Sequence, residues 1–333
     1  MILSGNRLDP IACEGILVIG DPHVGSRRPG RRKDAVWPQA VLGKLERCVA
    51  IANERSLAVV ILGDLFDRPV EPDEALKNQL IRILKGFRRR PIVNVGNHDI
   101  QHMTLTDSDT LALLGLCDVV DVVATSAPIA EFHIGARRLG MGMTPYGQAI
   151  PTDVRGSFAG VDLHAWFTHH DIAFEASYPG AVPPFAVEGC DVLVNGHIHK
   201  TQKSILAGGT RWMNPGNITR QSVDLADHVP RAWILDGGGE LEAQVLPFED
   251  NVFDLTGRVV EAADGDAVAR EVESAFVTLL QAESSTELKR SGDGSIVRDE
   301  IEARFAQDNT PDAVRAIVRS LLGEAVERHA AQS

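Results

Sequence analysis

Residues 15–25 read GILVIGDPHVG, in which an aliphatic run ends in a polar cluster that holds Asp21 and His23. A compact β-branched run of this length is typical of a buried strand. The same arrangement occurs four more times along the chain. The predicted strands at 57–62, 91–95, 163–168 and 191–194 are followed by GDLFDR (63–68), GNHD (96–99), HHD (169–171) and NGHIH (195–199).

Helical patterns separate the first three of these strands. Residues 41–54 and 74–87 are predicted helices, and in the second Leu76, Leu80 and Leu84 fall on one face. Strand–helix–strand alternation predicts an α/β layered domain with buried strands. Ligands bind at the carboxyl ends of the strands in such sheets. We therefore expect all five polar clusters to meet at one edge of the sheet.

The later part of the chain changes character. The runs at 203–207, 231–235 and 241–246 have no helices between them and are predicted antiparallel strands. From residue 251 the pattern becomes helical, at 266–280, 298–305 and 311–329, and this part holds 16 acidic and 9 basic residues. This shift in composition predicts two units. One is a large domain at 1–250, and the other is a small, mainly helical region at 251–333.

Composition limits the classes of function. The net charge of −13 means that any binding to nucleic acid must use a local basic surface. The four cysteines are scattered and form no CxxC pair, which argues against disulfides and zinc–thiolate sites and fits a reducing compartment. No apolar run approaches the roughly 20 residues needed to cross a bilayer, and residues 1–14 do not resemble a signal peptide. We expect a cytoplasmic protein without a membrane partner.

The polar clusters share one type of chemistry. They supply carboxylate oxygens, imidazole nitrogens and one amide oxygen, with no thiolate. Such mixed shells suit manganese, iron or zinc better than magnesium or calcium. There are too many of these side chains for one ion, and their number suits two ions that share a carboxylate. Paired ions activate a water molecule and neutralise phosphate oxygens. The clusters therefore predict two-metal hydrolysis of phosphate esters.

The ordered blocks DPHVG, GDLFDR, GNHD, the His169 block and GHIH resemble the calcineurin-like metallophosphoesterase superfamily over about residues 15–250. The resemblance implies a layered β-sandwich flanked by helices, with residues 1–250 as the catalytic domain and 251–333 as a capping and partner-binding region. It also implies two divalent ions, with Mn²⁺ expected and iron or zinc as alternatives. The implied ligands are Asp21, His23 and His199 for the first ion, Asn97, His169 and His197 for the second, and Asp64 as a bridge.

The resemblance also implies roles in catalysis. His98 matches the family's histidine that protonates the leaving group or holds the substrate phosphate. Asp67 matches the acid that orients this histidine, and Arg68 stands where phosphatase relatives place a phosphate-contacting arginine. The neighbouring His170 is an alternative to His169 as a ligand, and we prefer His169 because it directly follows the strand.

Within the superfamily the chain is most similar to the SbcD-type nuclease subunit of DNA-repair complexes. The shared features are GDLFD followed by GNHD, the NPGN turn at 214–217, and the crossover from VLPF (245–248) to FDL (253–255). The departures are Val24 in place of leucine, the phosphatase-like Arg68, and a short acidic cap. The resemblance implies a DNA exonuclease or endonuclease in repair or recombination, acting with an SbcC-type, SMC-like ATPase or as a homodimer.

Other functions remain open. A phosphodiesterase or phosphatase for small nucleotides or phosphoproteins would use the same metal chemistry, because the cap decides the substrate. A non-catalytic scaffold is disfavoured, since no ligand is missing and His98 is present. The basic run RRPGRRK (27–33) could contact a phosphate backbone or be a solvated loop. The apolar stripe of the predicted helix at 311–329 could dock a partner or pack on the helix at 266–280.

Overall fold

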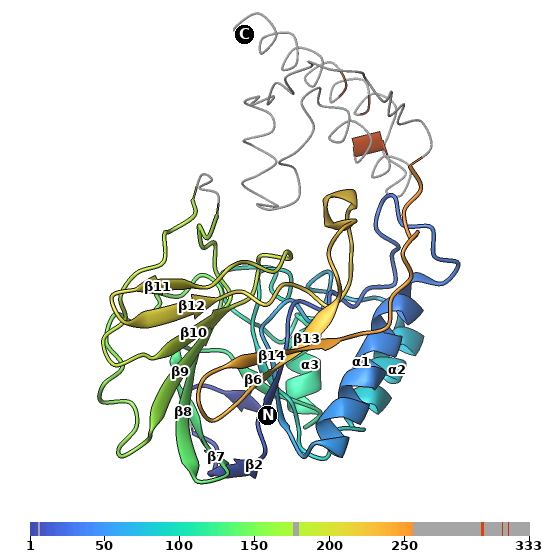
Figure 1. The fold of residues 1–333 in the computed structure, drawn as a ribbon. Coiled ribbons are helices and arrows are strands. Elements are labelled where there is room, and N and C mark those ends of the chain that lie inside the picture. The colour runs from blue at the N-terminus through green and yellow to red at the C-terminus, as the bar shows by residue number, and fades with distance from the viewer. Residues whose placement is uncertain (6, 176–179, 256–300, 303–314, 316–318, 320–333) are drawn as a thin grey trace, which may run out of the picture.

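The computed structural model describes residues 1–5, 7–175, 180–255, 301–302, 315 and 319 (Figure 1). Its core is a sandwich of two seven-stranded sheets. The first sheet has the order β1 (Ile2–Leu3), β6 (Asp121–Val123), β5 (Ile92–Asn94), β4 (Ala58–Ile61), β3 (Ile16–Ile19), β13 (Arg231–Leu235) and β14 (Leu241–Val245). Its neighbours from β1 to β3 are parallel, while β13 is antiparallel to both β3 and β14.

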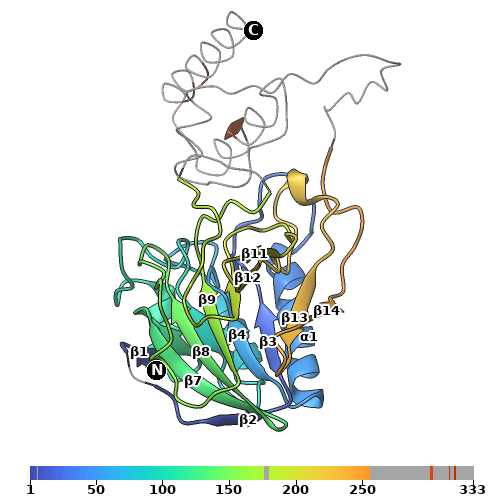
Figure 2. The same ribbon diagram turned by 60° about the vertical axis from the view of Figure 1, so that its left-hand side comes forward.

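The second sheet lies against the first (Figure 2). Its order is β11 (Ile205–Ala207), β12 (Thr210–Met213), β10 (Val192–Asn195), β9 (Leu163–Thr168), β8 (Arg137–Thr144), β7 (Ala127–Ile134) and β2 (Ile11–Cys13). The strands β8, β9, β10 and β12 are mutually parallel, and the pairs β7–β8 and β11–β12 are antiparallel. This arrangement confirms the predicted layered α/β fold.

Helices cover the outer face of the first sheet (Figure 1). They are α1 (Trp37–Glu54), α2 (Glu74–Leu84) and α3 (Thr110–Leu116), and a short 3₁₀ helix, η1, spans Val223–Leu225. The helix α2 begins where the Asp73 side chain accepts a hydrogen bond from the Leu76 amide at 3.1 Å. Its buried face consists of the predicted leucines 76, 80 and 84.

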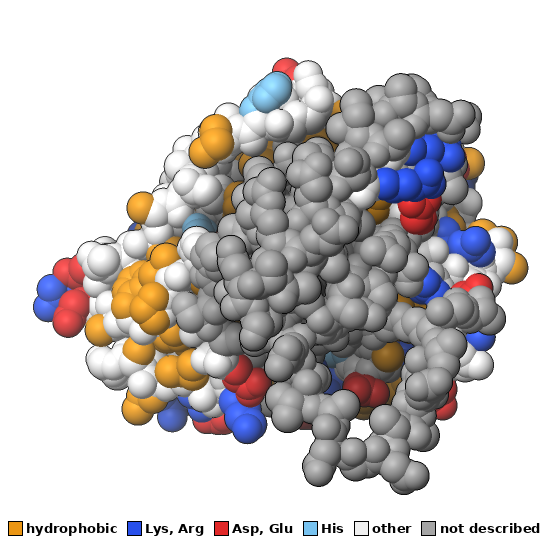
Figure 3. All heavy atoms as spheres, turned by 90° about the horizontal axis from the view of Figure 1, so that it is seen from above, with side chains coloured by type: hydrophobic (Ala, Val, Ile, Leu, Met, Phe, Trp, Pro, Cys, Tyr) orange, Lys and Arg blue, Asp and Glu red, His pale blue; other side chains and the backbone are white. Residues whose placement is uncertain are grey.

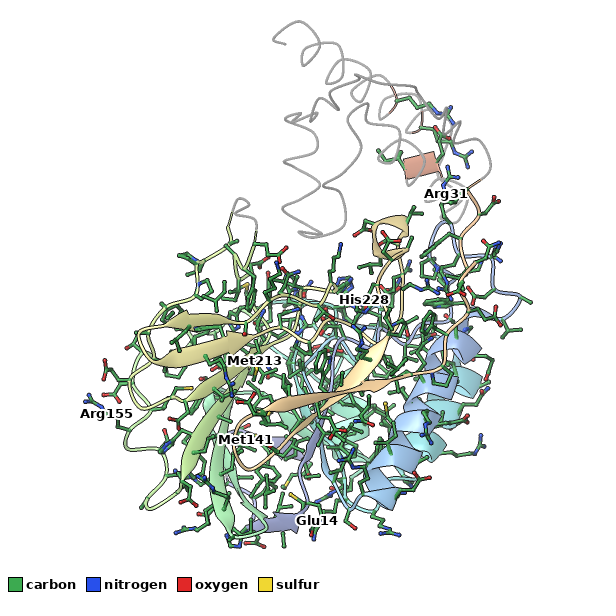
Figure 4. The ribbon with its side chains drawn as sticks, viewed as in Figure 1. Glu14, Arg31, Met141, Arg155, Met213 and His228 are labelled. Atoms are coloured by element: carbon green, nitrogen blue, oxygen red, sulfur yellow. The ribbon has the colours of Figure 1, made fainter. Side chains whose placement is uncertain are left out.

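The period of two in a strand explains why the central strands are apolar throughout. In β3, Leu17 and Ile19 pack toward the helices, while Ile16 and Val18 pack toward the second sheet. From the opposite side Met141 and Met213, both labelled in Figure 4, contribute to the layer between the sheets. A strand that is buried on both faces needs a continuous apolar run, which is the feature that residues 15–20 display.

Two predictions from the sequence are not confirmed by the structure. The five polar clusters do not lie at one sheet edge, because β3, β4 and β5 belong to the first sheet and β9 and β10 to the second. The prediction of a single sheet edge was therefore wrong. The clusters still meet, because the sandwich brings the strand ends of its two sheets together. The predicted helices at 266–280, 298–305 and 311–329 lie almost entirely outside the described residues, and so does most of the predicted cap region. The division at residue 250 stays a prediction.

Candidate metal centre

The first cluster of side chains joins both sheets at one point. His23 follows β3, Asp64 follows β4, and His199 follows β10. All three are buried, with one ligand atom of each lying within 4.8 Å of the others. The His23 Nε2 atom lies 2.9 Å from His199 Nε2 and 3.5 Å from Asp64 Oδ2. This group brings together two of the side chains predicted for the first ion, His23 and His199, with the predicted bridge Asp64.

A second cluster shares Asp64 with the first. It contains Asp64, His169 and His197, again with ligand atoms within 4.8 Å of one another. Asp64 Oδ2 lies 3.1 Å from His169 Nε2. Asn97 Oδ1 lies 3.3 Å from His169 Nε2 and 3.0 Å from His197 Nδ1. The structure therefore gathers the residues predicted for the second ion around the carboxylate predicted to bridge the two.

Asp21 is the seventh predicted ligand, and it lies outside both three-residue groups. Its Oδ1 atom is 3.6 Å from Nδ1 of His169. Among the described residues neither carboxylate oxygen of Asp21 has a hydrogen-bond partner, although the residue is fully buried. A buried carboxylate without a partner is costly unless a cation compensates it. This observation and the mixed nitrogen and oxygen donors both fit divalent metal ions.

Backbone strain is concentrated at these residues. Positive φ angles occur at Asp21 (31°), His23 (48°), Asp64 (47°) and His197 (72°). Non-glycine residues rarely adopt this region, and when they do the strain often marks a functional site. The first two loops hold each other in place, because the His23 amide donates to the Asp64 carbonyl at 2.9 Å and the Asp67 amide donates to the Val24 carbonyl at 3.0 Å.

Gly96 shows how tightly the loops are packed around the bridging residue. A Cβ atom at Gly96 would lie 2.1 Å from Asp64 Oδ1 and 2.4 Å from the Asp64 backbone nitrogen. His98, two residues after Gly96 in the same loop, donates its amide proton to the same Oδ1 at 2.8 Å. The GNHD block therefore needs glycine at its first position so that the loop can approach Asp64.

The imidazole of His98 lies beside both clusters. Its Nδ1 donates to the main-chain carbonyl of Asp67 at 2.9 Å, because a carbonyl can only accept, and this leaves Nε2 as the other ring nitrogen. Burial lowers the pKa of His98, but the Asp64 carboxylate and the Asp67 carbonyl outweigh burial, so the pKa is raised. The predicted pairing of Asp67 with His98 therefore uses a main-chain oxygen. The Asp67 carboxylate lies 3.8 Å from His23 Nδ1.

Asp64 and His169 form the main charge pair of the site. Burial raises the pKa of Asp64, but His169, His98 and His23 more than reverse this and hold it well below its usual value. Burial likewise lowers the pKa of His169, and Asp64 outweighs burial, so the pKa of His169 rises to about 9. Without metal, His169 therefore carries a proton next to Asp64. A divalent cation would displace that proton, since metal ligands must be deprotonated.

The structure distinguishes the two adjacent histidines. His169 is fully buried within the second cluster, and its Nδ1 contacts the Leu62 carbonyl at 3.1 Å. The His170 ring turns away, with Nε2 donating to the Gln148 carbonyl at 2.7 Å. Arg68, the third predicted catalytic side chain, is exposed, with Nε 4.0 Å from Asp67 Oδ2. The geometry thus places His169 and not His170 among the candidate ligands.

Sequence reasoning missed three residues around the site. Asp99 is buried and accepts hydrogen bonds from the amides of Gly96 (2.9 Å) and Phe66 (3.1 Å), which ties the GNHD and GDLFDR loops together. Asp171 Oδ1 lies 3.0 Å from His197 Nε2. The Tyr146 ring is centred 5.7 Å from that of His197. Asp99 and Asp171 stand within the quoted clusters, whereas nothing in the local sequence singles out Tyr146.

The basic run at 27–33 is partly structural. Arg32 is buried between the rings of Trp37 and Phe253, and its guanidinium also pairs with Asp34. The Lys33 amide donates to Val252, and the Asp254 amide donates to the Arg31 carbonyl. The run therefore fastens the segment at 252–254 to the domain. Arg27 and Arg28 are exposed. Figure 3, which views the molecule from above, shows Lys and Arg side chains around the margin of that face.

In the part of the chain that the structure describes, no helix is long and apolar enough to cross a membrane.

No curated protein matches the sequence of this chain. Among solved structures, a 5′-nucleotidase precursor from Thermus thermophilus is similar, with 14% identity and a TM-score of 0.43. That match covers 70% of this chain and 54%, about half, of the nucleotidase. A conserved uncharacterized protein from Streptococcus pneumoniae, described as a predicted phosphoesterase, has 14% identity and a TM-score of 0.29. That match covers 71% of this chain and 97% of the other.

The sequence of this chain matches a known protein family. The calcineurin-like phosphoesterase family matches residues 15–201, a stretch that contains all ten predicted site residues and every side chain of the two clusters. The match spans more than half of the 333-residue chain. This protein therefore belongs to the calcineurin-like phosphoesterase family of metal-dependent hydrolases.

Proposed function

We propose that this protein hydrolyses phosphodiester bonds of DNA with two divalent ions, expected to be Mn²⁺. The observation that carries the proposal is the shared position of Asp64, 3.5 Å from His23 and 3.1 Å from His169. A carboxylate in this position can join two ions into one centre. When bound, such ions activate a water molecule and neutralise the phosphate oxygens.

In this proposal the ligands divide between the two sheets. Asp21, His23 and His199 would hold the first ion, and Asn97, His169 and His197 the second, with Asp64 between them. The 2.9 Å separation of His23 Nε2 and His199 Nε2 supports the first group, because two ring nitrogens that face each other need a cation or a proton between them. The second group has a matching feature in the 3.0 Å separation of Asn97 Oδ1 and His197 Nδ1.

His98 would supply the proton for the leaving group. The oxygen of a water molecule would form a bond to phosphorus and release one proton to solvent. The bond between phosphorus and the leaving oxygen would break, and that oxygen would take the proton of His98 Nε2. The Asp67 carbonyl holds the opposite ring nitrogen at 2.9 Å, so that Nε2 is the atom directed to substrate. The raised pKa of His98 favours the protonated ring that this role needs.

DNA is the proposed substrate because the chain resembles the SbcD branch and because exposed cations follow the first metal loop. Arg27 and Arg28 follow the Gly20–Gly25 loop after one serine and lie at the surface, where a phosphate backbone could contact them. Arg32 is withdrawn into the contact with Trp37 and Phe253, so the basic surface is smaller than the sequence implies.

The second candidate is a phosphodiesterase or phosphatase acting on small nucleotides or phosphoproteins. One observation favours it. Arg68 is exposed beside Asp67, where it could contact the phosphate group of a small ester. Both candidates use the same metal centre, so they differ in the surface around it and not in the chemistry.

Purified protein incubated with Mn²⁺ and either labelled linear DNA or a generic aryl phosphodiester separates the two candidates. We expect cleavage of both substrates. The double variant Arg27→Ala/Arg28→Ala should cleave DNA several-fold more slowly, with a weaker salt dependence of binding, and should cleave the aryl ester at the original rate. Arg88→Ala/Arg89→Ala is the charge-matched control, because these two exposed arginines precede β5 at the opposite end of the sheet. Hydrolysis of the aryl ester without cleavage of DNA would favour the second candidate.

We further propose that the C-terminal region binds an SMC-like ATPase or a second copy of this chain. The proposal rests on the apolar stripe in the sequence at 311–329, which lies outside the described residues except at positions 315 and 319. Removal of residues 311–333 should leave a folded enzyme that still hydrolyses the aryl ester but no longer shows ATP-dependent DNA processing with its partner. Unfolding or aggregation of the truncated protein would show that the stripe belongs to the core.

A further inference from the structure

Asp171 places a carboxylate within hydrogen-bond distance of the ring of His197, a candidate ligand of the second ion. Its Oδ1 atom lies 3.0 Å from Nε2 of His197, while Nδ1 of the same ring lies 3.0 Å from Asn97 Oδ1. An ionised carboxylate only accepts hydrogen bonds, so Nε2 of His197 carries the proton. Nδ1, on the opposite side of the ring beside Asn97 Oδ1, is then the nitrogen available to a metal ion in the second cluster.

Main-chain hydrogen bonds hold the segment that carries Asp171. The Val182 amide donates to the Asp171 carbonyl at 2.9 Å, and the Ala173 amide donates to the Val182 carbonyl at 2.9 Å. The carboxylate therefore projects from a paired segment and not from an isolated loop. Its side chain is 22% exposed while that of His197 is 7% exposed, so the hydrogen bond is shielded from most of the solvent.

Tyr146 completes the arrangement from a different element. It follows β8, and its amide is bound to the Val95 carbonyl at 2.9 Å. Burial, and then interaction with the Asp171 carboxylate, raise the pKa of its hydroxyl. Its ring lies beside that of His197, with centroids 5.7 Å apart and planes inclined by 34°. Tyr146 thus contacts both partners of the Asp171–His197 pair.

His169 provides the contrast within the same cluster. Its Nδ1 lies nearer to the neutral carbonyl of Leu62 (3.1 Å) than to Asp21 Oδ1 (3.6 Å), which leaves Nε2 directed to Asp64. His197 has a carboxylate at the corresponding place, and a carboxylate increases the basicity of the ligating nitrogen more than a carbonyl does. His197 also has a φ angle of 72°, a backbone conformation that is strained for a residue other than glycine.

We propose that Asp171, supported by Tyr146, is a positioning residue that selects Nδ1 of His197 as a ligand and strengthens binding of the second metal ion. This inference rests on the proposed dinuclear function. It assigns a role to two residues that do not themselves bind the metal. It predicts that the two ions differ in their response to substitution of Asp171, since Asp171 contacts His197 of the second cluster.

The first test is calorimetric titration of the metal-free, full-length protein with Mn²⁺. Asp171→Ala should weaken one of the two binding events about 10- to 100-fold and leave the other within error of wild type. Asp171→Asn keeps an acceptor oxygen and should lose less. Tyr146→Phe removes only the hydroxyl and should weaken the same event by about 2- to 10-fold, as expected for one hydrogen bond. Asp153→Ala, which removes an exposed carboxylate paired with Arg155, is the control.

A second readout uses the metal-free protein and needs no activity. Nitrogen-15 spectra of labelled histidine, assigned with a His197→Asn variant, report which ring nitrogen carries the proton. Wild type and Tyr146→Phe should show His197 with the proton on Nε2, and Asp171→Ala should show a mixture of tautomers. An unchanged tautomer in Asp171→Ala, or an equal loss of affinity for both ions, would overturn the inference. If wild-type protein itself binds only one ion, the dinuclear proposal fails instead.

Discussion

The Nε2 atoms of His23 and His199 lie 2.9 Å apart, although the two residues are 176 positions apart in the sequence. His23 comes from the end of a strand in the first sheet and His199 from the end of a strand in the second. Burial lowers the pKa of His23 well below its usual value, so its ring is neutral and offers a lone pair. A shared cation would satisfy both nitrogens and link the two sheets.

This relationship predicts that metal stabilises the fold. A ligand that binds only the native state raises stability by about 2.7 kcal/mol at a concentration of 100 times its Kd. We expect Mn²⁺ to raise the Tm of the metal-free protein and expect His23→Ala to reduce that rise, because it removes a contact between the sheets. Scanning calorimetry with and without Mn²⁺ checks this. An equal rise in the wild type and in His23→Ala would show that the ion does not use His23.

Asp64 should matter more than any histidine, because its carboxylate approaches both clusters. We expect Asp64→Ala to weaken binding of both ions, His23→Ala to weaken mainly the first, and His169→Ala mainly the second. Metal analysis after dialysis against a fixed Mn²⁺ concentration measures the remaining ions in each variant. If Asp64→Ala kept one tightly bound ion, Asp64 would not be a bridge.

His98 should be needed for turnover and not for metal binding. His98→Ala should lower kcat by about 10²- to 10⁴-fold, the usual loss for a general acid, while both ions stay bound. The measurement is the rate of aryl phosphodiester hydrolysis beside the metal content of the same sample. Loss of metal from His98→Ala would instead make His98 a ligand.

Gly96 should tolerate no side chain. Gly96→Ala places a methyl group 2.1 Å from Asp64 Oδ1, so Asp64 or the loop must move. We expect a loss of roughly 1–3 kcal/mol in the free energy of unfolding, together with weaker metal binding. Gly43→Ala is the matched control, because Gly43 lies in α1 with open space around its Cα and should gain about 0.5–1 kcal/mol. Equal stability of the two variants would contradict the packing described for the GNHD loop.

Lys44 predicts a pH dependence of stability away from the metal centre. Burial, and then the charge of Arg32, lower its pKa from 10.5 to about 8. Between these values the unfolded chain holds a proton that the folded chain has lost, so stability rises with pH over this window. Relative to Lys44→Met, the wild type should gain about 3 kcal/mol between pH 8 and 10.5. Urea unfolding at both pH values measures the gain, and parallel curves for the two proteins would refute the burial of a charged Lys44.

The sequence predicted the central strands well because each is buried on both faces. Residues 15–20 and 57–62 are continuous apolar runs, which only a strand between two packed layers requires. The hairpin of β7 and β8 and the short helix α3 were not predicted. In β8 the small residues Gly140 and Gly142 accommodate the rings of Phe158 and Trp166, a tertiary contact that leaves no pattern in the local sequence.

The sequence was enough to predict which residues form the candidate site. It was not enough to predict how these residues contact one another. The ligand candidates stand at strand ends, and the packing of the two sheets gathers them. The contact of His98 with the carbonyl of Asp67 could not be predicted, because it depends on the path of the backbone and not on the side chain. Tyr146 reaches the site from β8, a strand that carries no polar cluster in the sequence, so its position follows only from the packing of the second sheet.

The number of metal ions per chain tests the central claim most directly. Metal-free protein should be titrated with Mn²⁺ to saturation, with bound metal measured by mass spectrometry and hydrolysis of an aryl phosphodiester followed in the same samples. We predict two ions per chain, with hydrolysis reaching its maximum only as the second ion binds. Saturation at one ion per chain with full hydrolytic activity would contradict the two-metal account.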